Sequence, residues 1–442
     1  MPINLVVVSP HGAATREALT RFENRKLWRA TIVVTDPNDD PSLVAEAGFE
    51  AIDWRTRPSG TRGLIKKNLR KATRFVLDNT RAGVFFQARD FCSFLSTRYA
   101  SQFDARSEKV VSLIKSNQAK AVFIFNDRSA GIESAAIHAA RACGVPVLGL
   151  GFAISADKQS LVFLRKALIY RVTPCSVGPN VDTITYCDRR YRFYRPFETK
   201  VLREKKVLSA NPWVLGCGNI DRFFIPSALE MERLISLGGP RSKYVCVGSR
   251  ALGQVIEKIS ERDVVKHRIV ASLGMPIDKK IIILALPQYY EHGFCSLRES
   301  RKIIKELITK LISQRNILLI SLHPKMNPAD YQWIEEPGKV RIVNENLYEY
   351  IFCGDVFVSS YSSTVEWALF SGVPVLNLDL MNQNYKNFFP GFGFNTVAEM
   401  SAIEGEVEKL LNLQASAAFP FEGRSALNVS KDFRDYVLAE IK

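Results

Sequence analysis

Short runs of apolar, mostly β-branched residues alternate with amphipathic segments along much of the chain. In the first half such runs occupy Leu5–Val8, Ala30–Val34, Ala121–Phe125 and Val145–Leu150, and Ile132–Cys143 has the periodicity of a helix. Because these runs do not alternate with polar residues, both faces of each predicted strand must be covered. The pattern therefore predicts an α/β fold in which helices cover both faces of a parallel sheet.

The pattern recurs in the second half, where strands are predicted at Ile281–Leu286, Ile317–Leu322, Val340–Val343, Val356–Ser359 and Val375–Leu378. "GVPVLGLG" (144–151) in the first half is echoed by "GVPVLNLD" (372–379) in the second. In both, glycine ends a helix and proline leads into a strand. We therefore predict two doubly wound domains. The N-terminal domain is expected over residues 1–250, a helical connector over 251–280 and the C-terminal domain over 281–442.

Composition agrees with this plan and indicates the kind of partner. A chain of 442 residues exceeds one ordinary core. Its 60 Lys and Arg against 45 Asp and Glu give a net charge of +15, which favours nucleic acid, an anionic membrane surface or phosphorylated substrates as partners. The eight scattered cysteines form no C-x-x-C pair, and we find neither a leader pattern nor an apolar run of about 20 residues. We expect a cytoplasmic protein with reduced thiols and no zinc site.

Two segments, 54–75 and 187–206, are strongly basic, and the second interleaves arginines with aromatic residues. This mixture favours docking on anionic lipid headgroups, with Tyr191, Phe193 and Tyr194 at the interface. The alternative is a solvated basic face. Single-stranded nucleic acid would use the same ingredients, but no RNA- or DNA-binding motif accompanies them, so we expect no nucleic-acid partner.

Polar loops follow three predicted strands of the second half, and ligands of open parallel sheets bind at the carboxyl ends of strands. The three loops should therefore line one cleft. In the first, "LPQYYEHGF" (286–294), Glu291 or His292 could act as a general base, the alternative being an ion pair within the loop.

The second loop is "LHPKMNP" (322–328). His323 can donate a hydrogen bond to a phosphate oxygen, Lys325 adds positive charge, and Pro324 makes the backbone rigid. The alternative is a histidine with a purely structural role.

The third loop precedes a predicted helix and carries five hydroxyl side chains, Ser359, Ser360, Ser362, Ser363 and Thr364. A helix cap needs one hydroxyl, so five favour a phosphate site over a simple capped loop. Glu366 lies one turn into the helix, where it could reach a ribose.

The His-Pro pair followed by the Ser/Thr-rich turn resembles the HP and S motifs of bacterial sialyltransferases, polysialyltransferases and Kdo transferases. The wider resemblance is to the superfamily of GT-B glycosyltransferases and UDP-sugar 2-epimerases, and "YVCVGSRALGQV" (244–255) resembles the end of its first domain. The resemblance implies two Rossmann-like domains facing across a cleft, with the nucleotide in the second and the acceptor in the first. It also implies that His323 and the turn Ser362–Thr364 hold the donor phosphate. The family's acidic motif is only approximated by Glu291-His292-Gly293.

Other activities share this fold. "FNDRSAGIESAAIHAA" (125–140) resembles a segment of the epimerases, in which Asp127 would match a catalytic carboxylate, but "GLGFAIS" (149–155) lacks the acid expected after the next strand. A transferase with a UDP-sugar or another donor and a non-catalytic nucleotide-sugar-binding protein remain alternatives.

We expect an inverting, metal-independent glycosyltransferase, peripheral on the inner face of the cell membrane, that builds a surface polysaccharide or a lipid-linked glycan. Its donor would be a nucleotide-activated sialic acid or Kdo-type sugar, with CMP as the expected nucleotide and no further cofactor. Glu291 or Asp127 would deprotonate the acceptor, while His323 and the hydroxyl turn stabilise the charge on the leaving phosphate.

Overall fold

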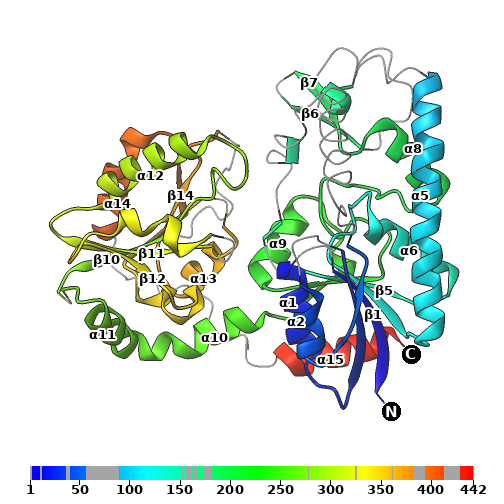
Figure 1. Cartoon of the computed structure of the whole chain (residues 1–442), viewed down its shortest axis with the longest axis horizontal. Coiled ribbons are helices and arrows are strands. Elements are labelled where there is room, and N and C mark those ends of the chain that lie inside the picture. Colours follow the sequence, from blue (N-terminus) through cyan, green and yellow to red (C-terminus); the bar gives the residue numbers. More distant parts are fainter. Residues whose placement is uncertain are drawn as a thin grey trace. The chain divides into compact units, whose positions relative to one another are not determined.

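A computed structural model of the chain describes residues 2–9, 12–35, 40–55, 89–151, 154–155, 161–162, 165, 168–172, 182–186, 188–276, 278–323, 326–360, 362–382, 394–412 and 429–441. The chain divides into two compact units. The first comprises Met1–Gly248 and Ser430–Lys442, and the second comprises Ser249–Val429. Each unit is built around its own parallel sheet (Figure 1).

The sheet of the first unit has seven strands in the order β3-β2-β1-β4-β5-β8-β9. They are β1 (Ile3–Ser9), β2 (Trp28–Val34), β3 (Glu50–Asp53), β4 (Ala121–Ile124), β5 (Val147–Leu150), β8 (Arg222–Ile225) and β9 (Tyr244–Cys246), and every pairing is parallel. The order reverses between β1 and β4, as in doubly wound sheets.

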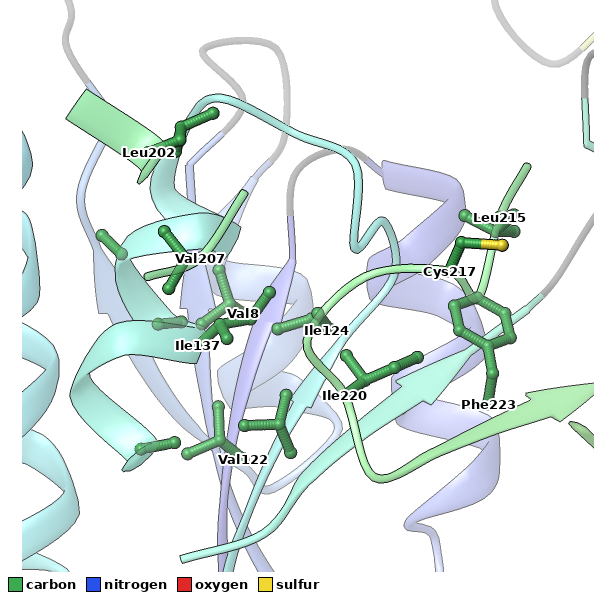
Figure 2. Packing of buried hydrophobic residues seen from close by; sticks show 14 of the residues in the cluster. Val8, Val122, Ile124, Ile137, Leu202, Val207, Leu215, Cys217, Ile220 and Phe223 are labelled. Carbon is green, nitrogen blue, oxygen red and sulfur yellow. The ribbon is translucent and has the colours of Figure 1, made fainter. Parts of the chain in front are cut away.

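Helices cover both faces of this sheet. They are α1 (Gly12–Arg21), α2 (Pro41–Glu46), α5 (Arg89–Ser116), α6 (Ile132–Ala142), α8 (Pro196–Glu204), α9 (Ala228–Ser236) and α15 (Val429–Glu440). Successive side chains of β1 point to opposite faces, so Val6 and Val8 pack in the core cluster with α5, α6 and α8 (Figure 2), whereas Leu5 and Val7 pack in the cluster with α1, α2 and α15. The antiparallel hairpin of β6 (Thr183–Tyr186) and β7 (Arg189–Arg192) and the 3-10 turns η1 (Leu168–Tyr170) and η2 (Arg241–Lys243) complete the described part of the unit.

One glycine of "GVPVLGLG" has a clear packing role. Gly149 lies in β5 beside Phe223 of β8, and a Cβ at this position would lie 2.1 Å from Cδ2 of that ring. The corresponding position in "GVPVLNLD" is Asn377, in a different sheet with different neighbours. The two echoing runs therefore form equivalent strands whose side chains fit different surroundings.

The sheet of the second unit has six strands in the order β12-β11-β10-β13-β14-β15. They are β10 (Lys280–Ala285), β11 (Asn316–Ser321), β12 (Val340–Val343), β13 (Val356–Ser359), β14 (Val375–Leu378) and β15 (Phe394–Val397), and all pair in parallel. The order reverses between β10 and β13.

On one face of this sheet, Ile282 and Leu284 pack in a cluster with α12 (Leu297–Leu311) and α14 (Ile403–Asn412). The unit also contains α10 (Arg250–Lys258), α11 (Arg262–Ser272) and α13 (Val365–Phe370), together with the 3-10 turns η3 (Ile259–Glu261), η4 (Pro328–Asp330), η5 (Gln332–Ile334), η6 (Leu347–Glu349), η7 (Ile351–Cys353) and η8 (Met400–Ala402). The prediction of two doubly wound, Rossmann-like units is confirmed.

The expected domain boundaries differ from the observed units at two places. Helices α10 and α11, expected as a connector, pack within the second unit, where Lys258 pairs with Glu349 and Arg262 donates to the carbonyl of Ser371. The C-terminal helix α15 belongs to the first unit, because the ring centroid of Phe433 lies 5.2 Å from that of Phe224. Sequence periodicity identifies a helix but not the core on which it packs.

The aromatic residues expected at a membrane interface are instead part of the core. Tyr191, Phe193 and Tyr194 are buried, and the Phe193 ring meets that of Trp213 edge-on at 5.2 Å between centroids. The prediction that these side chains contact lipid is therefore wrong, since all three are buried in the core cluster of the first unit. Most of the other basic segment, residues 56–75, lies outside the described residues. In the described part of the chain, no helix combines the length and apolar character needed to cross a bilayer.

Candidate active site

The carboxyl ends of the central strands of the second unit surround a cavity of about 730 Å³. Loops after β10, β11, β12 and β13 all contribute to its wall, at the point where the strand order reverses. Ligands of doubly wound sheets bind at this position. The lining includes Gln288, Tyr289, His292, Phe294, His323, Met326, Pro328, Asn344, Glu345, Asn346, Leu347, Tyr348, Ser360, Ser362, Ser363, Thr364 and Trp367. The three loops selected from the sequence thus line one cavity.

The loop after β10 forms a single helical turn that ends at Gly293. The backbone N–H of His292 donates to the carbonyl of Gln288 at 3.0 Å, and that of Phe294 donates to the carbonyl of Tyr289 at 2.9 Å. Gly293 has φ +73°, a conformation that favours glycine. The turn places His292 at the cavity wall, where its ring meets Phe294 edge-on at 5.8 Å between centroids.

Glu291 differs from the expectation for a catalytic base. It is exposed, it does not line the cavity, and its carboxylate accepts a hydrogen bond from the hydroxyl of Tyr331. Burial and the contact with Glu291 raise the pKa of the Tyr331 hydroxyl. Within the same helical turn, adjacent side chains point in different directions, so His292 reaches the cavity and Glu291 does not.

His323 follows β11 directly and lines the cavity while remaining exposed. Its backbone carbonyl accepts a hydrogen bond of 2.8 Å from the N–H of Met326, which closes the loop. The two other residues predicted here, Pro324 and Lys325, lie outside the described residues.

The hydroxyl turn after β13 presents Ser362, Ser363 and Thr364 to the cavity. The hydroxyls of Ser362 and Thr364 hydrogen-bond each other at 2.6 Å, and the N–H of Thr364 donates to Ser362 Oγ at 3.2 Å. Ser360 also lines the cavity and donates to the carbonyl of Leu378 at 2.8 Å, whereas Ser359 is fully buried in β13.

Glu366 does not reach the cavity as expected. Its side chain is buried within α13, and Trp367 contributes to the wall instead. The predicted contact between Glu366 and a ribose is therefore not supported, because the helix turns this carboxylate toward the protein interior.

The loop after β12 was overlooked in the sequence, although β12 itself was predicted. Its residues Asn344, Glu345 and Asn346 line the cavity because β12 ends at the same edge of the sheet as its neighbours. Tyr348 and Trp367 add aromatic walls, with ring centroids 6.2 Å apart and an interplanar angle of 77°. The rule that ligands bind at the carboxyl ends of parallel strands, which identified the other three loops, would also have identified this one.

Gln288 is a further missed residue. Its side-chain Nε2 is buried and finds no acceptor among the described residues, although Gln288 lines the cavity. Buried donors are almost always satisfied in native proteins, so a ligand that supplies an acceptor would complete this site.

Asp127 lies in the first unit and is not presented to solvent. Its side chain is 1% exposed, and its carboxylate accepts hydrogen bonds from the backbone N–H groups of Gly216, at 3.1 Å, and Gly218. A Cβ at Gly218 would lie 2.6 Å from Asp127 Oδ2, so glycine is required for this approach. Burial raises the pKa of Asp127. The carboxylate holds the 216–218 loop at the end of β4 and is not open to a ligand in this arrangement.

The chemistry of the cavity suits a phosphorylated ligand that carries a ring. Imidazoles, hydroxyls and amides can donate to phosphate oxygens, the carboxylate of Glu345 can accept from hydroxyls, and the aromatic walls can contact a ring. Among the residues that the structure describes, no group of three or more His, Cys, Asp and Glu side chains is placed to hold a metal ion.

No protein-family profile matches the sequence, and no curated protein matches it either. Several solved structures are similar in fold. The calicheamicin glycosyltransferase CalG4 aligns with a TM-score of 0.54 at 12% identity, over 100% of this chain and 98% of its own. The UDP-GlcNAc 2-epimerase of Neisseria meningitidis, bound to UDP-GlcNAc, aligns with 0.51 at 13% identity, over 99% and 100%. The spinosyn rhamnosyltransferase SpnG, complexed with thymidine diphosphate, aligns with 0.51 at 11% identity, over 99% and 96%.

These likenesses show the fold. The chain has the GT-B architecture shared by glycosyltransferases and UDP-GlcNAc 2-epimerases, as the resemblance in the sequence implied. They do not single out the sialyltransferases or the Kdo transferases among the proteins with this fold.

Proposed function

We propose that the protein is a glycosyltransferase that moves a sugar from a nucleotide-activated donor to a glycan or lipid-linked acceptor. The observation that carries the proposal is the cavity of the second unit. His292, His323 and the hydroxyl turn 362–364 all line this cavity, at the point where the strand order of the sheet reverses. A nucleotide sugar combines the phosphates, the ribose and the rings that such a wall can bind.

In the proposed complex, the donor phosphate lies against His323 and the hydroxyl turn. The ribose and base extend toward the loop after β12, where the Glu345 carboxylate can accept hydrogen bonds from ribose hydroxyls and Trp367 can contact a ring. The side-chain amide of Gln288 can donate to the sugar or to a phosphate oxygen.

During transfer, an acceptor hydroxyl attacks the anomeric carbon while the bond from that carbon to the leaving phosphate breaks. His323 and the hydroxyls stabilise the negative charge that grows on the phosphate. The acceptor proton passes to a base. Our candidate for this base is His292 and not Glu291, because His292 lines the cavity and Glu291 does not. Attack from the face opposite the phosphate inverts the anomeric configuration. The proposed step needs no metal ion or cofactor beyond the donor.

Two kinds of donor fit the proposal. The HP-like and S-like motifs favour a CMP-activated sialic acid or Kdo-type sugar, whereas the similar structures include proteins bound to UDP-GlcNAc and thymidine diphosphate. A thermal-shift panel of CMP, UDP, dTDP and GDP would separate these donors. A nucleotide present at about 100 times its Kd should stabilise the protein by ~2.7 kcal/mol. If no nucleotide raises the Tm, the cavity is not a donor site.

A UDP-sugar 2-epimerase shares the fold and is the second candidate function. An epimerase must remove a proton bound to carbon, yet Asp127, the residue that would match its carboxylate, is buried and bonded to backbone N–H groups. Incubation with UDP-GlcNAc in D₂O without an acceptor tests this alternative. Deuterium at C2 of the sugar would replace the transferase proposal with the epimerase.

The net charge of +15 supports a further part of the proposal, that the acceptor is reached at an anionic membrane surface on the cytoplasmic side. Sedimentation with anionic and neutral vesicles tests it. Equal recovery with both kinds of vesicle would count against a membrane-bound acceptor.

A further inference from the structure

We propose that the first unit contains a second binding site, for a carboxylate or phosphate group, formed by the guanidinium groups of Arg128 and Arg165. Arg128 follows β4, next to the point where the strand order of the first sheet reverses. Loops at this position bind ligands in doubly wound sheets. Arg165 lies in the chain between β5 and the 183–192 hairpin.

Both guanidinium groups lie near the same aromatic ring. The Cζ atom of Arg165 is 3.7 Å from the centroid of Phe193, and that of Arg128 is 6.0 Å from the same centroid. The Trp213 ring is 5.7 Å from Arg165 Cζ. Two arginines from segments that are distant in sequence are thus brought to one place by the aromatic core.

The protein groups that hold these arginines are neutral. Arg165 donates from Nε to the carbonyl of Phe193 at 2.8 Å and from Nη1 to the carbonyl of Leu161 at 3.0 Å. Arg128 donates from Nη1 to the carbonyl of Trp213 at a long 3.4 Å. These bonds orient both side chains without neutralising either charge.

Arg128 is only 8% exposed, and its Nε finds no acceptor in the described part of the chain. No carboxylate within the described ranges forms an ion pair with Arg128 or Arg165. Burial lowers the pKa of both side chains, that of Arg165 to about 10. A buried charge is costly without a counter-ion, so an anionic ligand would supply the missing partner.

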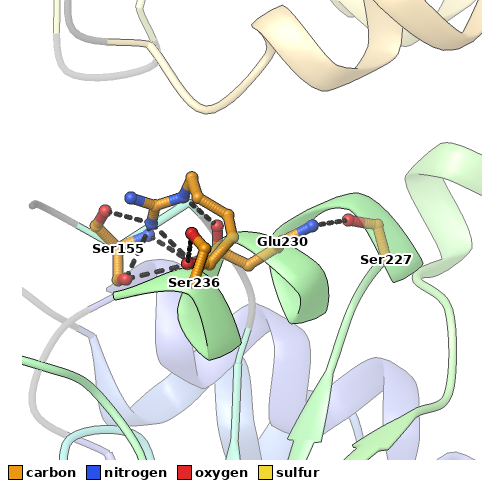
Figure 3. Close-up of polar contacts among 5 residues, drawn as sticks. Ser155, Ser227, Glu230 and Ser236 are labelled. Atoms are coloured by element: carbon orange, nitrogen blue, oxygen red, sulfur yellow. Dashed lines mark hydrogen bonds and ion pairs between the residues drawn. The ribbon is translucent and has the colours of Figure 1, made fainter. Parts of the chain in front are cut away.

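The acidic residues nearest to Arg128 already have other partners. Asp127 and, more weakly, Glu230 favour the charged form of Arg128, and Glu230 is bound to Arg233, with 2.7 Å between Arg233 Nε and Glu230 Oε2. Ser155 donates to the same carboxylate from its backbone N–H and its hydroxyl, each at 3.0 Å (Figure 3). This pair therefore neutralises itself.

The remaining carboxylates nearby also accept hydrogen bonds, but the donors to Asp127 and Asp182 are uncharged groups, which do not neutralise a carboxylate. Asp127 accepts from the backbone of the 216–218 loop, and Asp182 accepts from the hydroxyl of Thr199 at 3.1 Å. Glu198 lies 3.7 Å from Arg195 and accepts from its backbone N–H. None of these carboxylates lies within ion-pair distance of Arg128 or Arg165 in the described part of the chain, so an anionic ligand can still pair directly with the two guanidinium groups.

Guanidinium groups recognise the paired oxygens of a carboxylate or phosphate with parallel hydrogen bonds. Arg165 is half-buried, so a ligand can approach it from solvent. If the first unit holds the acceptor, which rests on the proposed function, that acceptor carries an acidic sugar or a phosphate. The binding of an anion by these two arginines does not rest on it.

Calorimetric titration of the full chain tests the site, with glucuronate and inorganic phosphate as probes and glucose as the neutral control. We expect wild type to bind at least one anion and not glucose. Arg165→Gln should weaken that affinity by about 10-fold or more, since it removes a charge-assisted hydrogen bond. Arg165→Lys keeps the charge, so it should recover part of the affinity, and it replaces the Gln variant if that fails to fold. The preferred probe distinguishes an acidic sugar from a phosphorylated acceptor.

Two control variants separate this site from the donor cavity. Arg189→Gln changes an exposed arginine of β7 in the same hairpin, and His323→Ala changes the donor cavity. Arg189→Gln should bind both anions as wild type does, and His323→Ala should bind glucuronate as wild type does while losing only the phosphate that binds in the donor cavity. The proposal is overturned if wild type binds neither anion, if both Arg165 variants bind as wild type does, or if only His323→Ala loses all anion binding. Nucleotide affinity should be unchanged in Arg165→Gln, because Arg165 does not line the donor cavity. If wild type binds no nucleotide, that result counts against the proposed function but not against this anion site.

Discussion

Replacing His323 by alanine is the most direct test of the donor cavity. The change removes an exposed imidazole from the cavity wall but leaves β11 intact, whose residues are all buried. Because the lost side chain is exposed, we expect the free energy of unfolding to change by no more than ~0.5 kcal/mol. The protein should therefore fold normally and bind its donor poorly.

The size of the loss follows from the role proposed for the imidazole. A hydrogen bond to a charged group contributes ~1.5–3 kcal/mol, which corresponds to roughly 10- to 150-fold in nucleotide affinity. A donor aimed at the charge that develops in the transition state is worth on the order of 10²-fold in turnover. We expect both effects in His323→Ala.

Calorimetry with the nucleotide selected by the thermal-shift panel measures the affinity, and a transfer assay measures kcat/KM. His267→Ala is the matched control, since His267 is exposed on α11 of the same unit and does not line the cavity. If His323→Ala binds the nucleotide as tightly as His267→Ala does, His323 does not hold the phosphate. If it fails to fold, the histidine has a structural role and our reasoning about the loop is wrong.

Further predictions concern the base, a buried acid and the C-terminal helix. His292→Gln should lower transfer on the order of 10²-fold, whereas Glu291→Gln should stay within about threefold of wild type, because His292 lines the cavity and Glu291 does not. The opposite result in the transfer assay would make Glu291 the base. Glu133 accepts hydrogen bonds from the N–H groups of Phe125 and Asn126, and burial raises its pKa to about 8. The folded protein therefore retains a proton that the unfolded chain releases, so stability should fall as pH rises from ~4.5 to 8, by at most ~1.4 kcal/mol per pH unit. Urea denaturation of Glu133→Gln should show a flatter pH dependence, and an unchanged slope would contradict this assignment. Phe433→Ala should cost ~3–5 kcal/mol of unfolding free energy, since the ring is buried against the first core; a loss below ~1 kcal/mol would show that α15 does not stabilise that core.

The strands and the place of the cavity were predictable because they depend on local rules. Continuously apolar runs form strands that are buried on both faces, and consecutive parallel strands end at one edge of a sheet. Knowing the strands before 286–294, 322–328 and 359–364 was therefore enough to bring these three loops together. The same rule would have added the loop after β12 had it been applied to every strand.

Tertiary structure decided which side chains are available for chemistry, because burial depends on residues far away in the sequence. Asp127 is hidden by bonds to Gly216, which is 89 positions away, and Phe193 by the ring of Trp213. Glu291 is held outside the cavity by Tyr331, which is 40 positions away. Helix α15 has the local pattern of any amphipathic helix, and only the aromatic core of the first unit shows where it packs. Local periodicity determined the secondary structure, while long-range packing determined the exposure of each charge.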